Sequence, residues 1–232
     1  MAWIGLDFEA MDGVHDCGGM HGLGAIEHDG GASPPFHEVW EGRMHAMMLA
    51  LAAAGHRKGS LRYGIESMGP TYLTTSYYEH WLFSVERSLN ESGLVPAGTL
   101  EARIAEGRLA AAQATSDQAL AATIRARLTQ AFRRPMEGPP PALRVGQQVR
   151  VDRYRTSHDG HTRCPRYVRG IEGVIERICP HEAFPEGLPL GEVTPMACYT
   201  VRFASTDIWG PDAEAFSLSV DLMERYLNGL SR

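Results

Sequence analysis

The segment PMEGPPPA, residues 135–142, divides the sequence into two parts of different character. Four of its eight residues are prolines. Proline ends helices and lacks a backbone N–H, and proline-rich segments are extended and semi-rigid. We therefore expect a linker over residues 135–142, with one domain before it and another, residues 143–232, after it.

Before the linker, the spacing of apolar residues is typical of helices. Four segments carry the pattern: 38–54, 75–92, 98–113 and 117–133. The first two repeat apolar residues at close to 3.6 positions, and the last two are rich in alanine, arginine, glutamate and leucine. Asp117 is a suitable N-cap and Pro135 ends the last segment. We expect a helical domain over residues 38–134.

The N-terminal stretch has no such period. Residues 11–35 hold seven glycines and only scattered apolar side chains. A segment of this composition cannot build a hydrophobic core of its own. We expect residues 1–37 to form a long extended arm that docks on a partner.

After the linker, the pattern changes to short alternating segments bounded by glycine and proline, which is typical of strands. The candidate strands lie in 145–151, 173–175, 198–203 and 216–220. Short strands in this arrangement favour a small antiparallel β-barrel. The expected fold class is α+β, with a helical N-terminal domain followed by this barrel.

Composition excludes several classes of protein. The formal net charge is -6, most of it in the first half, which disfavours a nucleic-acid binder. No apolar run is long enough to cross a membrane, and the first ten residues lack the basic start of a secretory signal, so we expect a cytoplasmic protein. The four cysteines form no CxxC pair, which argues against a zinc ribbon and predicts free thiols.

One basic stretch stands out against this acidic background. Residues 150–169 hold six arginines and two aspartates. The stretch is either a solvated loop surface or a site for an anion, because a guanidinium donates two parallel hydrogen bonds to paired oxygens. Pro165 restricts Cys164 to an extended conformation, which would hold Arg163 in a defined direction.

Two further candidates lie in the helical domain. Arg62 stands four residues before Glu66, so it is either a helix-surface ion pair or a second anion ligand. The aromatic residues at 72, 77, 78 and 81 are either core or the wall of a pocket. His37 with Glu38, or His158 with His161, is a weak candidate for a metal site, because histidines in surface loops are common.

Taken together, these segments resemble the beta subunit of nitrile hydratase. The matching pieces, in the family's order, are MDGVHDCGG (11–19), Trp40-Glu41 after the lead PPFH (34–37), RYGIESMG (62–69), SYYEHW (76–81), HTRCPRYVR (161–169), and 199–203 followed by DIWG (207–210). The resemblance covers roughly 11–230. The middle, 93–142, matches only as a variable helical region, and Met11 stands at the family's usual start.

The resemblance implies a C-terminal barrel of SH3-like fold and a tight heterodimer with an alpha subunit, as αβ or α2β2. That partner holds a non-haem iron(III) or non-corrin cobalt(III) ion through a short cysteine-rich motif with two oxidised cysteines. This chain has no such motif. We therefore expect it to bind no metal and to be inactive alone. The implied reaction is the hydration of a small-molecule nitrile to an amide; the metal, the nitrile and the nucleophile are left open.

The resemblance also implies roles for individual residues. Arg62 and Arg163 match the two positions that reach the partner's oxidised cysteines. Tyr77 and Trp81 match the aromatic wall of the substrate channel, where Tyr77 would donate a hydrogen bond near the active site. Met48 lies on a helix that supplies apolar pocket residues in the family. The arm would wrap the alpha subunit.

Other hypotheses remain open at this point. A thiocyanate hydrolase subunit has the same architecture, but there the two parts lie in separate chains. A second alternative is a nitrile hydratase dedicated to one biosynthetic substrate, such as a nitrile-bearing nucleoside. An SH3-like module that binds nucleic acid or protein would use the basic stretch 150–169. A metal-delivery accessory protein would resemble only the first half.

Overall fold

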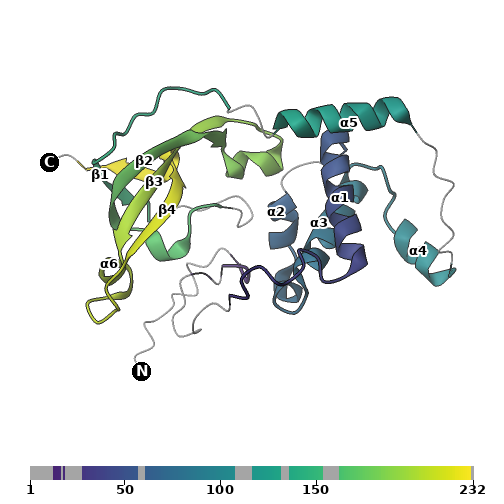
Figure 1. The fold of residues 1–232 in the computed structure, drawn as a ribbon, viewed down its shortest axis with the longest axis horizontal. Coiled ribbons are helices and arrows are strands. Elements are labelled where there is room, and N and C mark those ends of the chain that lie inside the picture. Colours follow the sequence, from purple (N-terminus) through teal and green to yellow (C-terminus); the bar gives the residue numbers. More distant parts are fainter. Residues whose placement is uncertain are drawn as a thin grey trace. The chain divides into compact units, whose positions relative to one another are not determined.

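The computed structural model describes residues 13–16, 18, 28–56, 61–107, 117–131, 136–153 and 162–230. These residues form two compact units, each described separately below (Figure 1). The helical unit comprises the described residues between 24 and 134. The sheet unit comprises those from 135 onward, together with the described residues before position 24.

The helical unit is built from short helices. They are α1 (Val39–Ala54), α2 (Leu61–Glu66), the 3-10 helix η2 (Gly69–Leu73), α3 (Tyr77–Glu91), α4 (Thr99–Ala105) and α5 (Gln118–Ala131). The sequence predicted α1, α3 and α5 to within two residues at each end. It missed α2, because six residues are too few to display a helical period.

The helix predicted over 98–113 is shorter than expected. Helix α4 ends at Ala105, and Gly107 follows with a φ of 65°. Glycine adopts this left-handed conformation at little cost and commonly terminates helices. Residues 108–113 lie outside the described part of the chain.

Capping side chains fix the starts of α1 and α3. The Glu41 carboxylate accepts hydrogen bonds from the backbone N–H groups of His37 and Glu38, at 2.6 and 3.1 Å. The Glu79 carboxylate accepts one from Ser76 at 2.6 Å, so Ser76 is the N-cap of α3. This bond also holds the pKa of Glu79 below its usual value.

A small apolar cluster joins the helices. Met44, Met48 and Val85 are its buried members, and partly buried side chains of α1, α2 and α3 pack around them. Helix α5 is joined to the end of α1, because the Arg127 guanidinium donates a hydrogen bond to the Ala53 carbonyl at 2.8 Å.

The sheet unit contains five antiparallel strands in the order β4-β3-β2-β1-β5. They are β1 (Gln148–Val151), β2 (Glu172–Ala183), β3 (Pro195–Ala204), β4 (Ser217–Met223) and β5 (Leu227–Gly229). Short helices connect them: η4 (Arg166–Val168), η5 (Pro185–Leu190), α6 (Ser205–Trp209) and η6 (Glu224–Tyr226).

The prediction of a closed barrel is wrong. Strands β4 and β5 are the two edges of the sheet, and no pairing joins them within the described residues. Strand β5 has three residues, all of which pair with β1. The sequence did not predict β5, because three residues are too few to show alternation.

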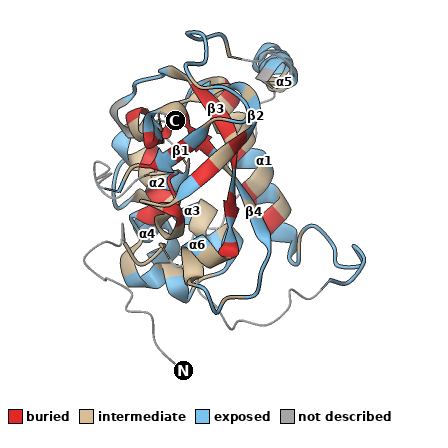
Figure 2. Ribbon diagram, turned by 90° about the vertical axis from the view of Figure 1, so that its left-hand side faces the viewer, coloured by how far each residue is buried: buried red, intermediate tan, exposed pale blue. Residues whose placement is uncertain are grey.

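One face of the sheet carries the main hydrophobic core. Alternate residues of β3, including Tyr199, Val201 and Phe203, are at most 1% exposed. Figure 2 shows buried positions concentrated along the strands. The predicted segment 198–203 lies within β3, and the predicted segment 173–175 is only the start of the twelve-residue β2.

The proline-rich linker lies against the sheet unit. Met136 forms an isolated bridge with His181, whose Nε2 is 2.7 Å from the Pro139 carbonyl oxygen. The backbone N–H of Leu143 donates to the Tyr199 hydroxyl at 3.2 Å, and that of Ala142 donates to the Glu224 carboxylate at 2.8 Å. Burial and the bond from its own hydroxyl to Glu224 raise the pKa of Tyr199 to about 12.

Two further observations bear on predictions made from composition. Cys164, Cys179 and Cys198 are free thiols, as predicted, while Cys17 lies outside the described residues. No helix in the described ranges combines the length and the apolar character needed to cross a membrane.

Candidate functional site

Arg62 lies on the short helix α2, one turn before Glu66. Its Nε donates a hydrogen bond to Glu66 Oε1 at 2.6 Å. The Glu66 side chain is 3% exposed, whereas that of Arg62 is 51% exposed. The buried carboxylate therefore fixes one edge of the guanidinium and leaves the terminal nitrogens available to an external anion.

Close packing at Gly64 holds α2 in place. An added Cβ at Gly64 would lie 2.2 Å from Ser84 Oγ and 3.0 Å from the Ser84 Cα on α3. Ser84 Oγ in turn donates a hydrogen bond to the Leu61 carbonyl at 2.7 Å. The position of Arg62 thus depends on a contact that only glycine permits.

We expect Gly64→Ala to lower the free energy of unfolding by about 1–3 kcal/mol, because the extra methyl group overpacks the contact between α2 and α3. Urea denaturation of the helical unit within the full chain measures this. Gly42→Ala in α1 is the matched control, since its added Cβ would meet Phe36 at 3.4 Å, an ordinary contact. Equal stability of both variants would contradict the role given to Gly64.

Arg163 lies in a loop that is held on both sides. Its backbone N–H donates to the Tyr226 hydroxyl at 3.3 Å. Before it, Thr162 Oγ1 donates to Glu186 at 2.7 Å. After it, Cys164 is 1% exposed and its carbonyl accepts a hydrogen bond from Arg169 Nη2 at 2.9 Å. The backbone of this loop is therefore fixed by its neighbours.

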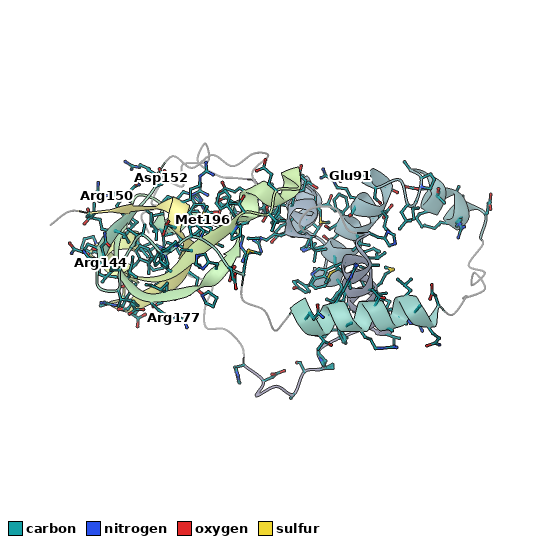
Figure 3. The ribbon with its side chains drawn as sticks, turned by 90° about the horizontal axis from the view of Figure 1, so that it is seen from above. Glu91, Arg144, Arg150, Asp152, Arg177 and Met196 are labelled. Atoms are coloured by element: carbon teal, nitrogen blue, oxygen red, sulfur yellow. The ribbon has the colours of Figure 1, made fainter. Side chains whose placement is uncertain are left out.

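The Arg163 side chain, in contrast, is exposed. Within the described part of the chain it has no hydrogen bond or ion pair. Other arginines of the basic stretch do: Arg150 pairs with Glu172, and Arg166 pairs with Asp16. Figure 3 labels Arg150 on the sheet unit. A fixed backbone with an unengaged guanidinium is suited to bind an external anion.

Asp16 of the N-terminal arm contacts the same region. Asp16 Oδ2 lies 3.3 Å from Arg166 Nε, and both side chains are 13% exposed. Gly18 packs on the ring of Tyr167, where an added Cβ would lie 3.4 Å from a ring carbon. Burial raises the pKa of Tyr167. Asp16 and Gly18 thus rest on the sheet unit of their own chain, and docking of the arm on a partner stays a prediction.

Tyr77 and Trp81 belong to an aromatic cluster at the start of α3. Their ring centroids are 5.6 Å apart, and Tyr77 also meets Tyr78 edge-to-face at 5.2 Å. Trp81 stacks on His45 of α1 at 5.4 Å. The Tyr77 side chain is 63% exposed, which leaves its hydroxyl accessible from outside the unit.

Met48 lies beneath this cluster. It is 7% exposed and packs in the same apolar cluster as Trp81 and Tyr78. The structure therefore brings Met48, Tyr77 and Trp81 together, although Met48 belongs to the core and its role in a pocket stays a prediction. Sequence reasoning missed Phe36 and His45, which complete the cluster. Phe36 lies just before α1, in the segment PPFH, and His45 lies within α1, so the sequence placed neither of them beside the ring of Trp81 or Tyr78.

The two arginines belong to different units, Arg62 to the helical unit and Arg163 to the sheet unit. Their roles toward a partner's anionic groups stay predictions. Among the described residues, no group of three or more His, Cys, Asp or Glu side chains could hold a metal ion. Of the weak metal candidates, His37 lies 4.0 Å from Glu41, and His158 and His161 lie outside the described residues.

Comparison with known proteins gives matches over nearly the whole chain. Residues 11–127 match the family model for the N-terminal part of the nitrile hydratase beta subunit, and residues 132–229 match that for its C-terminal part. The sequence is 36% identical over 226 residues to the beta subunit of the low-molecular-weight cobalt-containing nitrile hydratase of Rhodococcus rhodochrous. That match covers 94% of this chain and 99% of the relative.

Two other relatives are similarly close. The nitrile hydratase beta subunit of Pseudomonas putida is 33% identical over 222 residues, with 94% of this chain and 99% of the relative covered. The cobalt-containing enzyme's beta subunit from Pseudonocardia thermophila is 31% identical over 227 residues, with 94% and 96% covered. A solved chain of thiocyanate hydrolase from Thiobacillus thioparus matches 51% of this chain and all of its own length, at 23% identity and a TM-score of 0.39.

Proposed function

The chain belongs to the nitrile hydratase beta subunit family, and we propose that it is the beta subunit of a complex that hydrates nitriles to amides. The observation that carries this proposal is the match of both family models, in order and over almost the whole chain. The extensive coverage of curated nitrile hydratase beta subunits supports it.

We propose that an alpha subunit binds the metal ion and that this chain supplies side chains around that metal site without binding the metal itself. Two of the relatives named above come from cobalt-containing enzymes, which favours cobalt over iron. A metal ion bound in the partner would supply Lewis acidity toward the nitrile or water. The contribution of this chain is to position anionic groups, to bind substrate and to exclude water.

Arg62 and Arg163 are the residues that position the anionic groups. Oxidised cysteines carry negative oxygens, and burying them at an interface without partners is costly. A guanidinium offsets that cost with paired, charge-assisted hydrogen bonds and fixes the oxygens in place. The unengaged side chain of Arg163 and the free edge of Arg62 support this role.

Tyr77, Trp81 and Met48 are proposed to line the substrate channel. The exposure of Tyr77 beside the partly buried Trp81 supports this, because such a pair presents an apolar wall with one polar group. In this arrangement the Tyr77 hydroxyl donates a hydrogen bond close to the reacting groups, while the rings shape the channel.

Tyr77→Phe tests the hydroxyl separately from the ring. We expect kcat of the assembled enzyme to fall about tenfold with unchanged thermal stability, because the ring contacts remain and one hydrogen bond is lost. Tyr78→Phe is the matched control, since Tyr78 is its direct neighbour and is packed in the cluster. Equal effects of the two substitutions on kcat would contradict the assignment of Tyr77.

Co-expression with an alpha subunit of the same enzyme family, in medium containing cobalt or iron, tests the proposed function. Purified complex should convert small nitriles to amides, and amide detection measures this. The same assay should include thiocyanate, the substrate of the alternative hydrolase. Turnover of thiocyanate without turnover of any nitrile would replace the proposal, and absence of a stable complex would refute it.

The finer features of the fold are also proposals. We propose an arm over 1–37, a helical domain over 38–134, a linker over 135–142 and an SH3-like domain over 143–232, in a cytoplasmic protein. The five antiparallel strands and the division of the described residues into two compact units support the helical and the sheet part of this organisation.

A further inference from the structure

Two cysteines stand directly opposite each other in the sheet unit. In the antiparallel pairing of β2 with β3, Cys179 is the register partner of Cys198. We propose that these two side chains form a reversible disulfide when the protein meets a small-molecule disulfide such as oxidised glutathione. This inference is independent of the proposed function.

The geometry of the pairing suits this bond. Residues directly opposite each other on antiparallel strands have Cα atoms about 4.5 or 5.5 Å apart, depending on the type of pair. Both separations lie within the range of about 4.4–6.8 Å found in disulfides. Directly opposed side chains also project from the same face of the sheet. The thiol of Cys198 is already hydrogen-bonded with that of Cys179, so the two sulfur atoms are direct neighbours before any bond forms.

The surroundings keep the two thiols together on the face opposite Tyr199 and Val201. Cys179 Sγ lies 3.3 Å from Thr200 Oγ1, and Thr200 Oγ1 donates to Asp221 Oδ1 at 2.6 Å. Arg177, labelled in Figure 3, lies on the same face, and its guanidinium donates hydrogen bonds to Thr200 Oγ1 at 3.1 and 3.2 Å. Burial, and to a smaller extent the neighbouring Cys179, raises the pKa of the Cys198 thiol to about 12.

The difference in exposure sets the order of reaction. Cys179 is half-buried, whereas Cys198 is 3% exposed. The Cys179 thiolate attacks the external disulfide and releases one thiolate. Cys198 then gives up its proton and attacks the Cys179 sulfur, releasing the second. The two cysteines lose two electrons and two protons, and the external disulfide becomes two thiols.

The cross-link would fix an irregular part of the sheet. The register of β2 with β3 shifts between Cys179 and Glu182, so Cys179–Cys198 is the last regular pair before a bulge. His181, within this bulge, carries the bridge to Met136 and the hydrogen bond to Pro139 of the linker. Oxidation would therefore hold the strand segment on which the linker is anchored.

Peptide mapping of the full chain tests the proposal. The native, reduced protein is treated with oxidised glutathione, its remaining thiols are alkylated, and it is digested with trypsin. Residues 178–202 contain no internal lysine or arginine, so both cysteines lie in one peptide. We expect this peptide to lose two hydrogens and to escape alkylation. Cleavage after glutamate should then yield two fragments joined until reduction.

Matched variants separate this pair from the other thiols. Cys164→Ala removes a buried thiol elsewhere in the core and should leave oxidation of the 178–202 peptide unchanged. In the Cys198→Ala variant, the reaction with oxidised glutathione should stop at a mixed disulfide between Cys179 and glutathione. In the wild-type chain, alkylation of both cysteines after oxidation would overturn the proposal, as would a persistent glutathione adduct or a bond from either cysteine to Cys17 or Cys164.

Discussion

Replacing Arg163 by lysine is expected to lower kcat of the assembled enzyme by about 10–100-fold while the complex still forms. Losses of this size are typical when a group that supports a metal site from outside is altered. Lysine keeps the positive charge but cannot donate two parallel hydrogen bonds to paired oxygens. The change should therefore affect the reaction much more than assembly.

The surroundings of Arg163 make this substitution a clean test. The loop is fixed through the backbone of Arg163, the side chain of Thr162 and the carbonyl of Cys164, none of which the substitution removes. Arg150→Lys is the control, because Arg150 is an exposed arginine of the same unit that pairs with Glu172. Steady-state amide formation and gel filtration provide the two readouts. Wild-type kcat in Arg163→Lys would refute the role of its guanidinium.

Arg62→Lys is expected to have a loss of similar size, about 10–100-fold in kcat. A lysine can still pair with Glu66, so α2 should be retained. The substitution removes the guanidinium edge that Glu66 leaves open, which is the part proposed to contact the partner's oxygens.

The helical unit provides a matched control for Arg62. Arg87 pairs with Glu91 at the same i,i+4 spacing on α3, at 2.7 Å, and its partly buried guanidinium lies over the ring of Tyr63. Arg87→Lys should leave kcat within about twofold of wild type, because lysine keeps the charge beside Glu91 and Arg87 has no proposed contact with the partner's oxygens. Kinetics of both variants, each as the purified complex, distinguish the two arginines. Similar kcat values in Arg62→Lys and Arg87→Lys would show that Arg62 is only a helix-surface ion pair.

The sequence predicted those parts of the fold that depend on local patterns. Helices α1 and α3 have regular apolar spacing, and β3 alternates clearly, so their periods were visible without tertiary information. Helix α2 and strand β5 are too short to show a period. They are stabilised by contacts with distant residues, such as Ser84 against Gly64 and β1 beside β5.

Long-range contacts also explain what was missed around the linker and the site. The prolines at 139–141 predict an extended segment, but nothing in them indicates that His181 and Glu224 anchor it to the sheet. The i,i+4 spacing did predict the Arg62–Glu66 pair, which the structure contains. The contact of Asp16 with Arg166 joins residues at opposite ends of the sequence, and no local signal could reveal it.

The most direct test of the central claim is a titration of the separately purified, metal-loaded alpha subunit with this chain. We expect neither protein alone to form amide from a nitrile. Turnover should rise with added chain and saturate at one equivalent, because we propose that each active centre takes one Arg62 and one Arg163 from this subunit. Full turnover by the alpha subunit alone, or none at any ratio with the metal confirmed in place, would contradict the account.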